Sequence, residues 1–436
     1  MRRIIITSLL VVAMAAMAAA TSPRDEIAAR LTRSASNHYN YPYPELSLPT
    51  LTPAPAGYEP FHIEHYGRHG SRWSTSMSTY TRPVKEMEKA ERNHQLTDVG
   101  RATLATLRAI RDAAQGREGE LSDVGAEQHR GIAERMFRNF PQVFSGDAQI
   151  DARSTIIVRC ILSMLNETQT LQGLNPQLRI TADASVYDMP YMGWGYGEDT
   201  CANKLRARMK LISDSVKMAW NNADRFAAQL FIDPGFVADS IRAKSLMLDV
   251  FDVAGGLQDI HRFDSTDLYH LFTADEIYNL WRANNVKWYV NWGPAPANGS
   301  RLPFIERALL ANIIRTADEA IATGRRGAAL RFGHETCVLP LACLLEIDDV
   351  NLHTTDLDNL HNLWRCYDII PMACNIQMVF YRPTDRTQAD DVLVKVLFNE
   401  HEARLPIATD RFPYYRWADV KPYYEQKLRT VIDWTN

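Results

Sequence analysis

Strand-like segments recur near both ends of this chain, and the long stretch between them contains few. Polar and apolar side chains alternate over residues 61–66, and further short strand-like runs occur at 148–152, 178–186, 328–332, 376–381 and 392–398. Helical patterns separate these runs. Strands that alternate with helices are typical of an α/β fold with a largely parallel sheet. We therefore predict a doubly wound, mostly parallel sheet core to which both ends of the chain contribute.

The stretch 188–320 has a different residue pattern from the rest of the chain. Long helical patterns replace the strand signals there, and the stretch carries a set of tryptophans, Trp194, Trp220, Trp281, Trp288 and Trp292. We predict a mainly helical cap domain inserted into the core. The expected division is 21–187 for the first part of the α/β core, 188–320 for the cap and 321–436 for the second part of the core.

The first twenty residues are typical of a secretory signal peptide. Arg2 and Arg3 form a positive start, residues 4–17 are mostly apolar, and residues 18–20 are alanines that suit a cleavage site. We expect residues 1–20 to be removed and the protein to be periplasmic or secreted. No later stretch reaches 18 apolar residues, which argues against a membrane-spanning helix after cleavage.

Composition and charge restrict the range of partners. With 46% hydrophobic and 23% charged residues, the chain has an ordinary globular composition. Its net charge of −4 becomes −6 without residues 1–20, because two arginines and no acidic residue are lost. A mildly acidic chain is not typical of a nucleic-acid-binding protein, although a local basic pocket is compatible with it. The sequence leaves the oligomeric state open.

Six cysteines follow the predicted signal peptide: Cys160, Cys201, Cys337, Cys343, Cys366 and Cys374. In an exported protein this even number permits up to three disulfides, and spacing alone does not select a pairing. Cys366 and Cys374 form the closest plausible pair across a loop. Cys337 and Cys343 lie in an apolar segment, and we predict that they are buried thiols.

The most informative local motif is Tyr66-Gly67-Arg68-His69-Gly70-Ser71-Arg72, which directly follows the predicted strand at 61–66. Ligands of open α/β sheets bind at the carboxyl ends of the strands. Arg68 and Arg72 flank His69, and a guanidinium offers planar donors that match phosphate oxygens. Such a cluster suits in-line phosphoryl transfer, which needs positioning and charge neutralisation. On its own, the motif would equally suit an anion-binding or salt-bridged turn.

Arg68-His69-Gly70-Ser71-Arg72 resembles the RHGxR signature of the histidine phosphatase superfamily, in its branch of acid phosphatases, phytases and multiple inositol polyphosphate phosphatases. Further segments follow in that family's order. Asp151-Ala152-Arg153-Ser154-Thr155 resembles the segment that carries a third phosphate-binding arginine, and Gly333-His334-Glu335-Thr336 resembles the late His-acid motif. Leu121-Ser122-Asp123-Val124-Gly125 resembles a helix start of this branch. Several motifs in order are far more specific than one.

The resemblance implies a set of roles for these residues. His69 would attack phosphorus and form a phosphohistidine intermediate. The phosphoryl oxygens would be held by Arg68, Arg72, Arg153 and His334. A neighbouring acid would protonate the leaving alcohol and later help to activate water. The resemblance implies no metal and no cofactor, because guanidinium groups supply the positive charge.

The late motif departs from the family pattern. Most members of the branch carry His-Asp at this point, and the inositol polyphosphate phosphatases carry His-Ala-Glu-Thr. In this chain Glu335 directly follows His334, and Thr336 stands where the inositol polyphosphate phosphatases have their glutamate. Threonine cannot serve as a proton donor near neutral pH. We therefore predict that Glu335 is the catalytic acid.

We expect an exported phosphomonoesterase that acts on small-molecule phosphate monoesters, with inositol phosphates among the candidates. The unusual Glu335-Thr336 pair also suits a phosphate-ester binding protein with impaired turnover. A phosphomutase is a further alternative, which the export signal disfavours. Extra cations in the cleft would favour a polyphosphorylated substrate, and their helical spacing is equally typical of a solvated face. The candidates are Lys204, Arg206, Arg208 and Lys210.

Overall fold

The computed structural model describes residues 22–41, 50–193, 200–385 and 391–434. The predicted signal peptide at 1–20 lies outside these residues. Among the helices in the described ranges, none is both long and apolar enough to cross a membrane.

A sheet of eight strands forms the core, in the order β3-β2-β4-β1-β5-β6-β7, with β8 also paired to β6. The strands are β1 (Tyr58–Arg68), β2 (Gln149–Ser154), β3 (Arg179–Asp183), β4 (Gly327–Gly333), β5 (Asn375–Pro383), β6 (Leu393–Phe398), β7 (His401–Glu402) and β8 (Tyr414–Arg416). β3, β2, β4 and β1 are parallel neighbours. β5 is antiparallel to β1, and β6 is antiparallel to β5, so β6 runs in the direction of β1. The predicted α/β fold with a mostly parallel sheet is confirmed.

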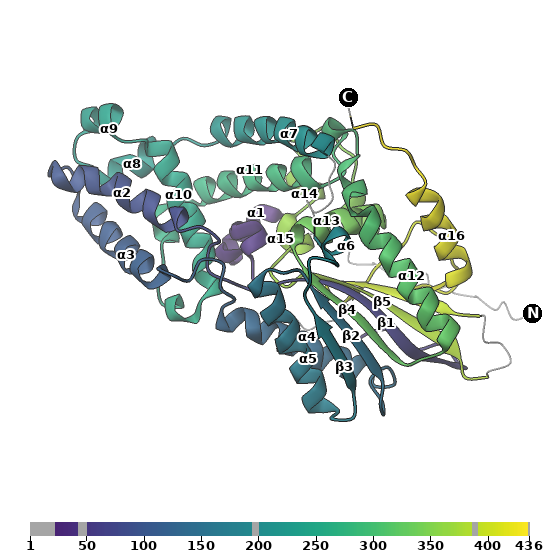
Figure 1. Ribbon diagram of the computed structural model, residues 1–436. Coiled ribbons are helices and arrows are strands. Elements are labelled where there is room, and N and C mark those ends of the chain that lie inside the picture. The colour runs from purple at the N-terminus through teal and green to yellow at the C-terminus, as the bar shows by residue number, and fades with distance from the viewer. Residues whose placement is uncertain (1–21, 42–49, 194–199, 386–390, 435–436) are drawn as a thin grey trace, which may run out of the picture.

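Helices cover both faces of the sheet (Figure 1). One face packs against α4 (Asp123–Asn139) and α5 (Val158–Leu174), and the other against α12 (Arg307–Thr323), α13 (Glu335–Leu344) and α16 (Trp417–Leu428). Successive residues of a strand point to opposite faces. Accordingly Ile63 of β1 belongs to the cluster with α4 and α5, whereas Tyr66 belongs to the cluster with α12 and α13.

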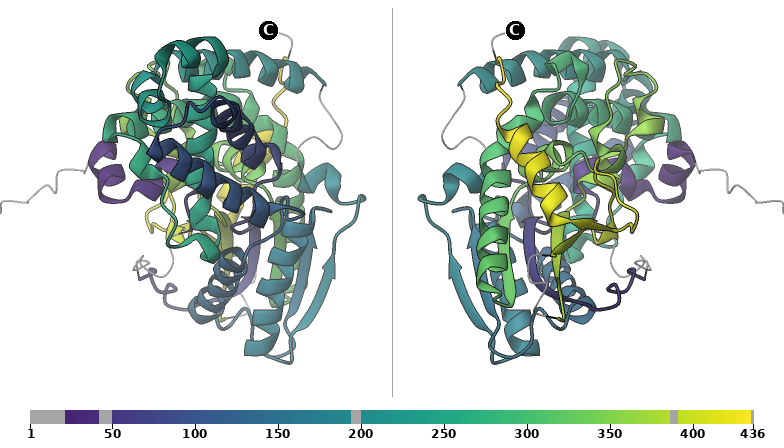
Figure 2. Two further views of the ribbon diagram at one scale, coloured as in Figure 1. Left: turned by 90° about the vertical axis from the view of Figure 1, so that its left-hand side faces the viewer. Right: turned by 90° about the vertical axis from the view of Figure 1, so that its right-hand side faces the viewer.

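Further helices form a helical part, which Figure 2 shows above the strands from two sides. These elements are α1 (Pro23–Ala29), η1 (Leu31–His38), α2 (Ser78–Arg92), α3 (Asp98–Ala114), α7 (Thr200–Ala219), α8 (Asp224–Leu230), α9 (Pro234–Ser240), α10 (Ala243–Gly256) and α11 (Ala274–Trp292). One apolar cluster joins α2 and α3 with α8, α10 and α11, whereas α7 and α11 share another apolar cluster with the sheet. The helical part therefore includes helices that precede residue 188. In addition α12, which begins inside the range 188–320 and ends at Thr323, contacts β1. The boundaries of the cap stay a prediction.

Short helical turns connect these elements. They are α6 (Met189–Met192), η2 (Leu257–Asp259), η3 (His261–Phe263), η4 (Tyr269–Leu271), η5 (Pro296–Asn298), η6 (Leu302–Glu306), η7 (Asp348–Asn351), α14 (Leu360–Leu363) and α15 (Cys366–Ile369). Two of the long helices begin at related sequences. The Thr97 hydroxyl accepts from the Gly100 amide at the start of α3, and the Ser122 hydroxyl accepts from the Gly125 amide at the start of α4. Each hydroxyl satisfies a backbone donor that the first turn leaves unpaired.

The cysteines within the described residues are free thiols. The expected pairing of Cys366 with Cys374 is therefore wrong: both are buried, and each is held by its own backbone contacts. The Cys366 amide donates to Asn285 Oδ1 (2.8 Å), and the Cys374 carbonyl accepts from the Arg68 amide (2.9 Å). Cys337 and Cys343 are buried on α13, which confirms that prediction. The side chain of Cys201 lies outside the described structure.

Candidate active site

His69 follows β1 at the carboxyl edge of the parallel strands. Its amide donates to the Gly333 carbonyl at the end of β4 (2.9 Å), and its carbonyl accepts from the Ala373 amide just before β5 (3.2 Å). The side chain is 1% exposed. The backbone of His69 is therefore fixed by both strands that neighbour β1.

The hydrogen bond of the His69 ring assigns its tautomer. Nδ1 lies 2.9 Å from the Gly70 carbonyl oxygen, which can only accept, so Nδ1 carries the hydrogen and Nε2 presents a lone pair. Burial lowers the pKa of His69 well below its ordinary value, and the charges of Arg159, Arg68 and Arg72 add to the effect. A neutral imidazole with a free Nε2 is the form in which histidine acts as a nucleophile.

Two glycines explain how the loop after His69 fits against α4. A Cβ atom on Gly70 would lie 2.4 Å from the Gly125 carbonyl oxygen, and one on Gly125 would lie 2.2 Å from the Ser71 carbonyl oxygen. The two backbones are thus in direct contact, which only glycine permits. The Ser71 amide also donates to Gln128 Oε1 (2.8 Å). The RHGxR motif and the helix start at 121–125 therefore form one unit.

Arg68 and Arg72 place buried guanidinium groups beside His69. Arg68 is 0% exposed, its Nε lies 3.0 Å from Glu335 Oε2, and its Nη1 donates to the Ile370 carbonyl (3.0 Å). Arg72 is 9% exposed, and its Nη1 donates to the Trp73 carbonyl (3.1 Å). Within the described residues, Arg68 Nη2 and Arg72 Nε have no hydrogen-bond partner. Buried donors without partners are what a bound oxyanion would satisfy.

The third arginine at the site is Arg159, which the sequence analysis missed. Among the charges that lower the pKa of His69, that of Arg159 is the largest, and the same holds for His334. Arg159 lies in the first turn of α5. The helix dipole disfavours a cation at this position. An arginine in the first turn of a helix, four residues after the segment 151–155, is the sequence feature that could have indicated this anion site.

Arg153 does not lie with the other arginines beside His69, which corrects the prediction that it binds the phosphoryl oxygens. Its Nε lies 2.9 Å from Asp151, and its Nη1 lies 3.0 Å from Asp183 and 3.5 Å from Asp188. These acids hold the guanidinium at the β2–β3 edge of the sheet. The strand directs its side chain to the same face as that of Asp151, two residues earlier. The helix that follows β2 supplies the arginine at the site instead.

The late motif brings His334 and Glu335 to His69. The His334 and His69 rings meet edge to face, with centroids 5.5 Å apart, and Glu335 Oε2 lies 3.9 Å from His69 Nε2. Burial lowers the pKa of His334 to about 4. For Glu335, burial raises the pKa, but Arg68, Arg72 and His334 outweigh this effect and lower it to about 2. At neutral pH the site therefore contains two neutral imidazoles and a carboxylate.

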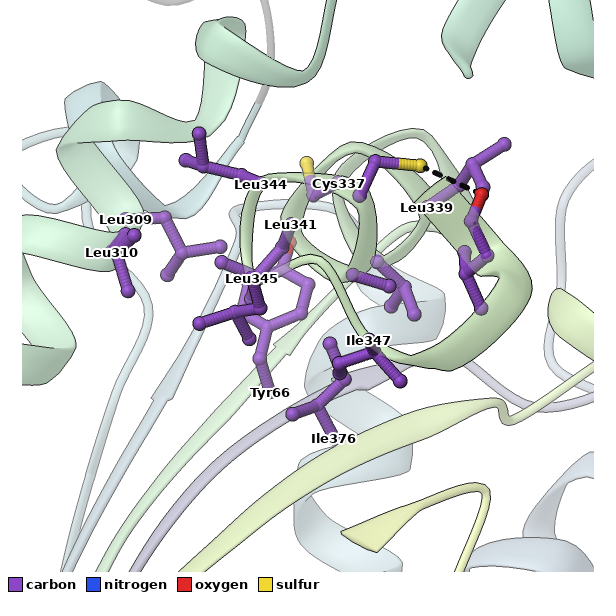
Figure 3. Close-up of a cluster of buried hydrophobic side chains, with 14 of the residues drawn as sticks. Tyr66, Leu309, Leu310, Cys337, Leu339, Leu341, Leu344, Leu345, Ile347 and Ile376 are labelled. Carbon is purple, nitrogen blue, oxygen red and sulfur yellow. Dashed lines mark hydrogen bonds between the residues drawn. The ribbon is translucent and has the colours of Figure 1, made fainter. Parts of the chain in front are cut away.

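The position of Glu335 depends on the packing of α13, which His334 caps and Glu335 begins. Figure 3 shows the leucines of α13 against α12 and the sheet. Fully burying one such side chain stabilises the fold by about 1.5–3 kcal/mol. The labelled members are Tyr66, Leu309, Leu310, Cys337, Leu339, Leu341, Leu344, Leu345, Ile347 and Ile376, all 2% exposed or less.

Asn37 joins the site from the end of η1, and no local sequence signal points to it. Its Nδ2 donates to Glu335 Oε1 (3.2 Å), and its Oδ1 accepts from Trp288 Nε1 on α11 (3.2 Å). Its carbonyl accepts from Arg68 Nη1. Asn37 thus connects the carboxylate, a guanidinium and the helical part.

The same residues have to be considered as a metal site. His69, His334 and Glu335 each offer one ligand atom, and these atoms lie within 4.8 Å of one another. Two imidazoles and a carboxylate are a common ligand set for Zn²⁺. Three guanidinium groups at the same site repel a cation, and they suit an anion. That no metal is needed stays a prediction.

Comparison with known proteins supports the architecture. No protein-family model and no curated protein matches this sequence. Solved structures do match. The Bifidobacterium longum multiple inositol polyphosphate phosphatase, in complex with inositol hexasulfate, has a TM-score of 0.73 at 19% identity, over 89% of this chain and 97% of that one.

Two phytases are also similar in structure. The phytase from D. castellii has a TM-score of 0.65 at 12% identity, over 92% of this chain and 86% of that one. The Hafnia alvei phytase in its apo form has a TM-score of 0.51 at 13% identity, over 86% of this chain and 98% of that one. The chain therefore has the fold of the phytases and multiple inositol polyphosphate phosphatases, the histidine acid phosphatase branch that its motifs resemble.

Proposed function

We propose that this protein is an exported phosphomonoesterase that transfers the phosphoryl group of its substrate to His69 and then to water. One observation carries the proposal. A buried, neutral imidazole presents a free Nε2 atom, with three guanidinium groups around it and a carboxylate 3.9 Å away. Phosphoryl transfer needs a positioned nucleophile, charge neutralisation around the oxygens and a proton donor for the leaving group.

In the first step, Arg68, Arg72, Arg159 and His334 hold the phosphoryl oxygens. Nε2 of His69 attacks phosphorus in line while the bond from phosphorus to the ester oxygen breaks. The departing alkoxide takes a proton from Glu335. The hydrogen bond from Nδ1 to the Gly70 carbonyl keeps the imidazole in place and stabilises the positive charge that the ring gains.

In the second step, the Glu335 carboxylate accepts a proton from a water molecule as the oxygen attacks phosphorus. The bond from phosphorus to Nε2 breaks, which releases inorganic phosphate and restores neutral His69. Glu335 has to be protonated for the first step and ionised for the second. A bound phosphoryl group neutralises the guanidinium charges that lower the Glu335 pKa to about 2, and it can itself bring the proton that Glu335 donates.

The low pKa of Glu335 also supports a second candidate, a phosphate-ester binding protein with impaired turnover. Thr336, where the inositol polyphosphate phosphatases have their acid, cannot replace it. Such a protein would bind phosphate esters tightly and release no phosphate. Turnover by the parent protein would exclude this candidate.

Phosphorylated inositols come first among the candidate substrates, because a similar structure is an inositol polyphosphate phosphatase with inositol hexasulfate bound. The test is phosphate release from an aryl phosphate and from inositol hexakisphosphate in the presence of EDTA. We compare the parent with His69→Ala and Glu335→Gln, and we look for an added phosphoryl mass on chains quenched during turnover. Activity that needs a metal, or an active His69→Ala variant, contradicts the proposal.

A further inference from the structure

The two carboxylate oxygens of Glu335 have different surroundings. Oε1 accepts a hydrogen bond from Asn37 Nδ2 (3.2 Å), and among the described side chains Asn37 alone donates to this carboxylate in hydrogen-bond geometry. Oε2 lies 3.0 Å from Arg68 Nε and 3.9 Å from His69 Nε2. Oε1 therefore faces η1, whereas Oε2 faces the nucleophile.

The orientation of the Asn37 amide is assigned by its second partner, Trp288. The oxygen and nitrogen of an amide are distinguished by the groups with which they form hydrogen bonds. Trp288 Nε1 can only donate, and it lies 3.2 Å from Asn37 Oδ1. The amide oxygen therefore faces Trp288, and the NH₂ group has to face Glu335. Trp288 is 5% exposed, so water does not compete for this contact.

The backbone of Asn37 is fixed beside the site as well. Its carbonyl accepts from Arg68 Nη1, which also donates to the Ile370 carbonyl (3.0 Å). Ser36, directly before it, has φ 60° and ψ −118°, which interrupts the helical course of η1. A non-glycine residue keeps such a conformation only where the surrounding structure holds it. η1 packs against α10, α11 and α15, and Figure 1 shows it in purple below α11.

A donor on Oε1 has its largest effect when Glu335 gives up its proton. In the first step the proton moves from the carboxyl to the leaving oxygen, and the electron pair of the O–H bond stays on Glu335 as carboxylate charge. A hydrogen bond to a charged acceptor is roughly twice as strong as one to a neutral acceptor, so the Asn37 contact strengthens as the proton leaves. A proton on Oε1 would point at the NH₂ group, and two donors would then face each other.

We propose that Asn37 is a positioning residue for the catalytic acid: it keeps the transferable proton on Glu335 Oε2 and stabilises the carboxylate that forms when the leaving group is protonated. Trp288 is a second positioning residue, because it orients the Asn37 amide. This inference rests on the proposed function. It adds to the reaction two residues, from η1 and α11, that neither the RHGxR motif nor the late motif contains.

The test uses two aryl esters whose leaving groups differ in acidity. p-Nitrophenol is a much stronger acid than phenol, so p-nitrophenyl phosphate needs little protonation of its leaving group, whereas phenyl phosphate depends on it. For phenyl phosphate we expect Asn37→Ala to lower kcat/KM by roughly tenfold, and for p-nitrophenyl phosphate by at most about threefold. Trp288→Phe keeps an aromatic ring without the N–H, and it should change the ratio of the two kcat/KM values in the same direction.

The matched control is Asn298→Ala, a buried asparagine of the same helical part. Asn298 is 1% exposed, and its Nδ2 donates to the Val290 and Gly293 carbonyls at the end of α11 (3.0 and 2.9 Å). This variant should lower the unfolding temperature and keep the parent's ratio of the two kcat/KM values. In a Glu335→Gln background, Asn37→Ala should also leave the ratio unchanged, because its effect passes through Glu335.

Equal losses on both esters would mean that Asn37 acts through folding or through Arg68, and would overturn the inference. Unchanged kinetics, or an effect on the ratio that persists in the Glu335→Gln background, would do the same. If Asn37→Ala does not fold, Trp288→Phe decides, and an unchanged ratio rejects the inference.

Failure of the proposed function gives a different result. If the parent releases no phosphate from either ester, the proposed function fails, and this inference fails with it because no leaving group is protonated. If Glu335→Gln discriminates between the two esters and Asn37→Ala does not, only the role of Asn37 is rejected.

Discussion

Replacing Glu306 by glutamine should change how the stability of the protein depends on pH. Glu306 ends η6 directly before α12, and its side chain is 3% exposed. Its Oε1 atom has no hydrogen-bond partner among the described residues. Burial raises the pKa of this carboxyl to about 8, and a hydrogen bond with Cys337 reduces the rise in part. The protein therefore folds with this carboxyl protonated.

The magnitude follows from proton linkage. In the unfolded chain the carboxyl titrates near its ordinary value of 4.5, so between pH 4.5 and about 8 the unfolded state has lost a proton that the folded state keeps. Because the pKa is raised in the folded state, the free energy of unfolding falls as the pH rises through this window. The slope is about 1.4 kcal/mol per pH unit, and the whole window amounts to on the order of 5 kcal/mol.

Glu306→Gln removes this titration and keeps the shape of the side chain. The assay is urea-induced unfolding, followed by tryptophan fluorescence at several pH values between about 5 and 8. We expect the midpoint of the parent to fall with pH more steeply than that of Glu306→Gln. The matched control is Glu319→Gln on the surface of α12, where Glu319 is 58% exposed and pairs with Arg315. This control should follow the slope of the parent.

If the urea midpoints of the parent and of Glu306→Gln fall equally with pH, the reasoning is refuted, because the buried carboxyl then does not titrate in this window. The result bears on the active site as well. η6 packs against α13, the helix that begins with Glu335. An ionised Glu306 at alkaline pH would therefore place a buried charge beside this helix.

Three further predictions concern the site itself. Arg159→Met should lower kcat/KM for an aryl phosphate by roughly a hundredfold to a thousandfold, whereas Arg153→Met should lower it by less than about fivefold. If Arg153→Met has the larger effect, Arg153 binds the phosphoryl group as the sequence predicted. Gly125→Ala should reduce both the unfolding temperature and activity, since the new Cβ would lie 2.2 Å from the Ser71 carbonyl oxygen. NMR of ¹⁵N-labelled histidine should show His69 neutral and protonated on Nδ1 at about pH 5.5, a full unit below the ordinary pKa of 6.5. An imidazolium signal at that pH would contradict the lowered pKa, and a neutral ring with its hydrogen on Nε2 would contradict the assigned tautomer.

Much of the site could be predicted because its parts lie directly after strands. His69 follows β1 and His334 follows β4, and these strands are parallel neighbours. The carboxyl ends of parallel neighbours meet at one edge of the sheet, so two motifs far apart in the chain converge there. Local pattern was sufficient for β1 to β6 and for the helix starts at Thr97 and Ser122, whereas the short strands β7 and β8 were not predicted.

Other features were decided by the tertiary structure alone. The pleat of β2 directs Arg153 toward the acids beside it, while the start of α5 brings Arg159 to His69. Asn37 reaches Glu335 across 298 residues of chain. No periodicity or motif marks such contacts. Sequence pattern reports which side of one element is buried, whereas the partner across the interface is selected by how whole elements pack.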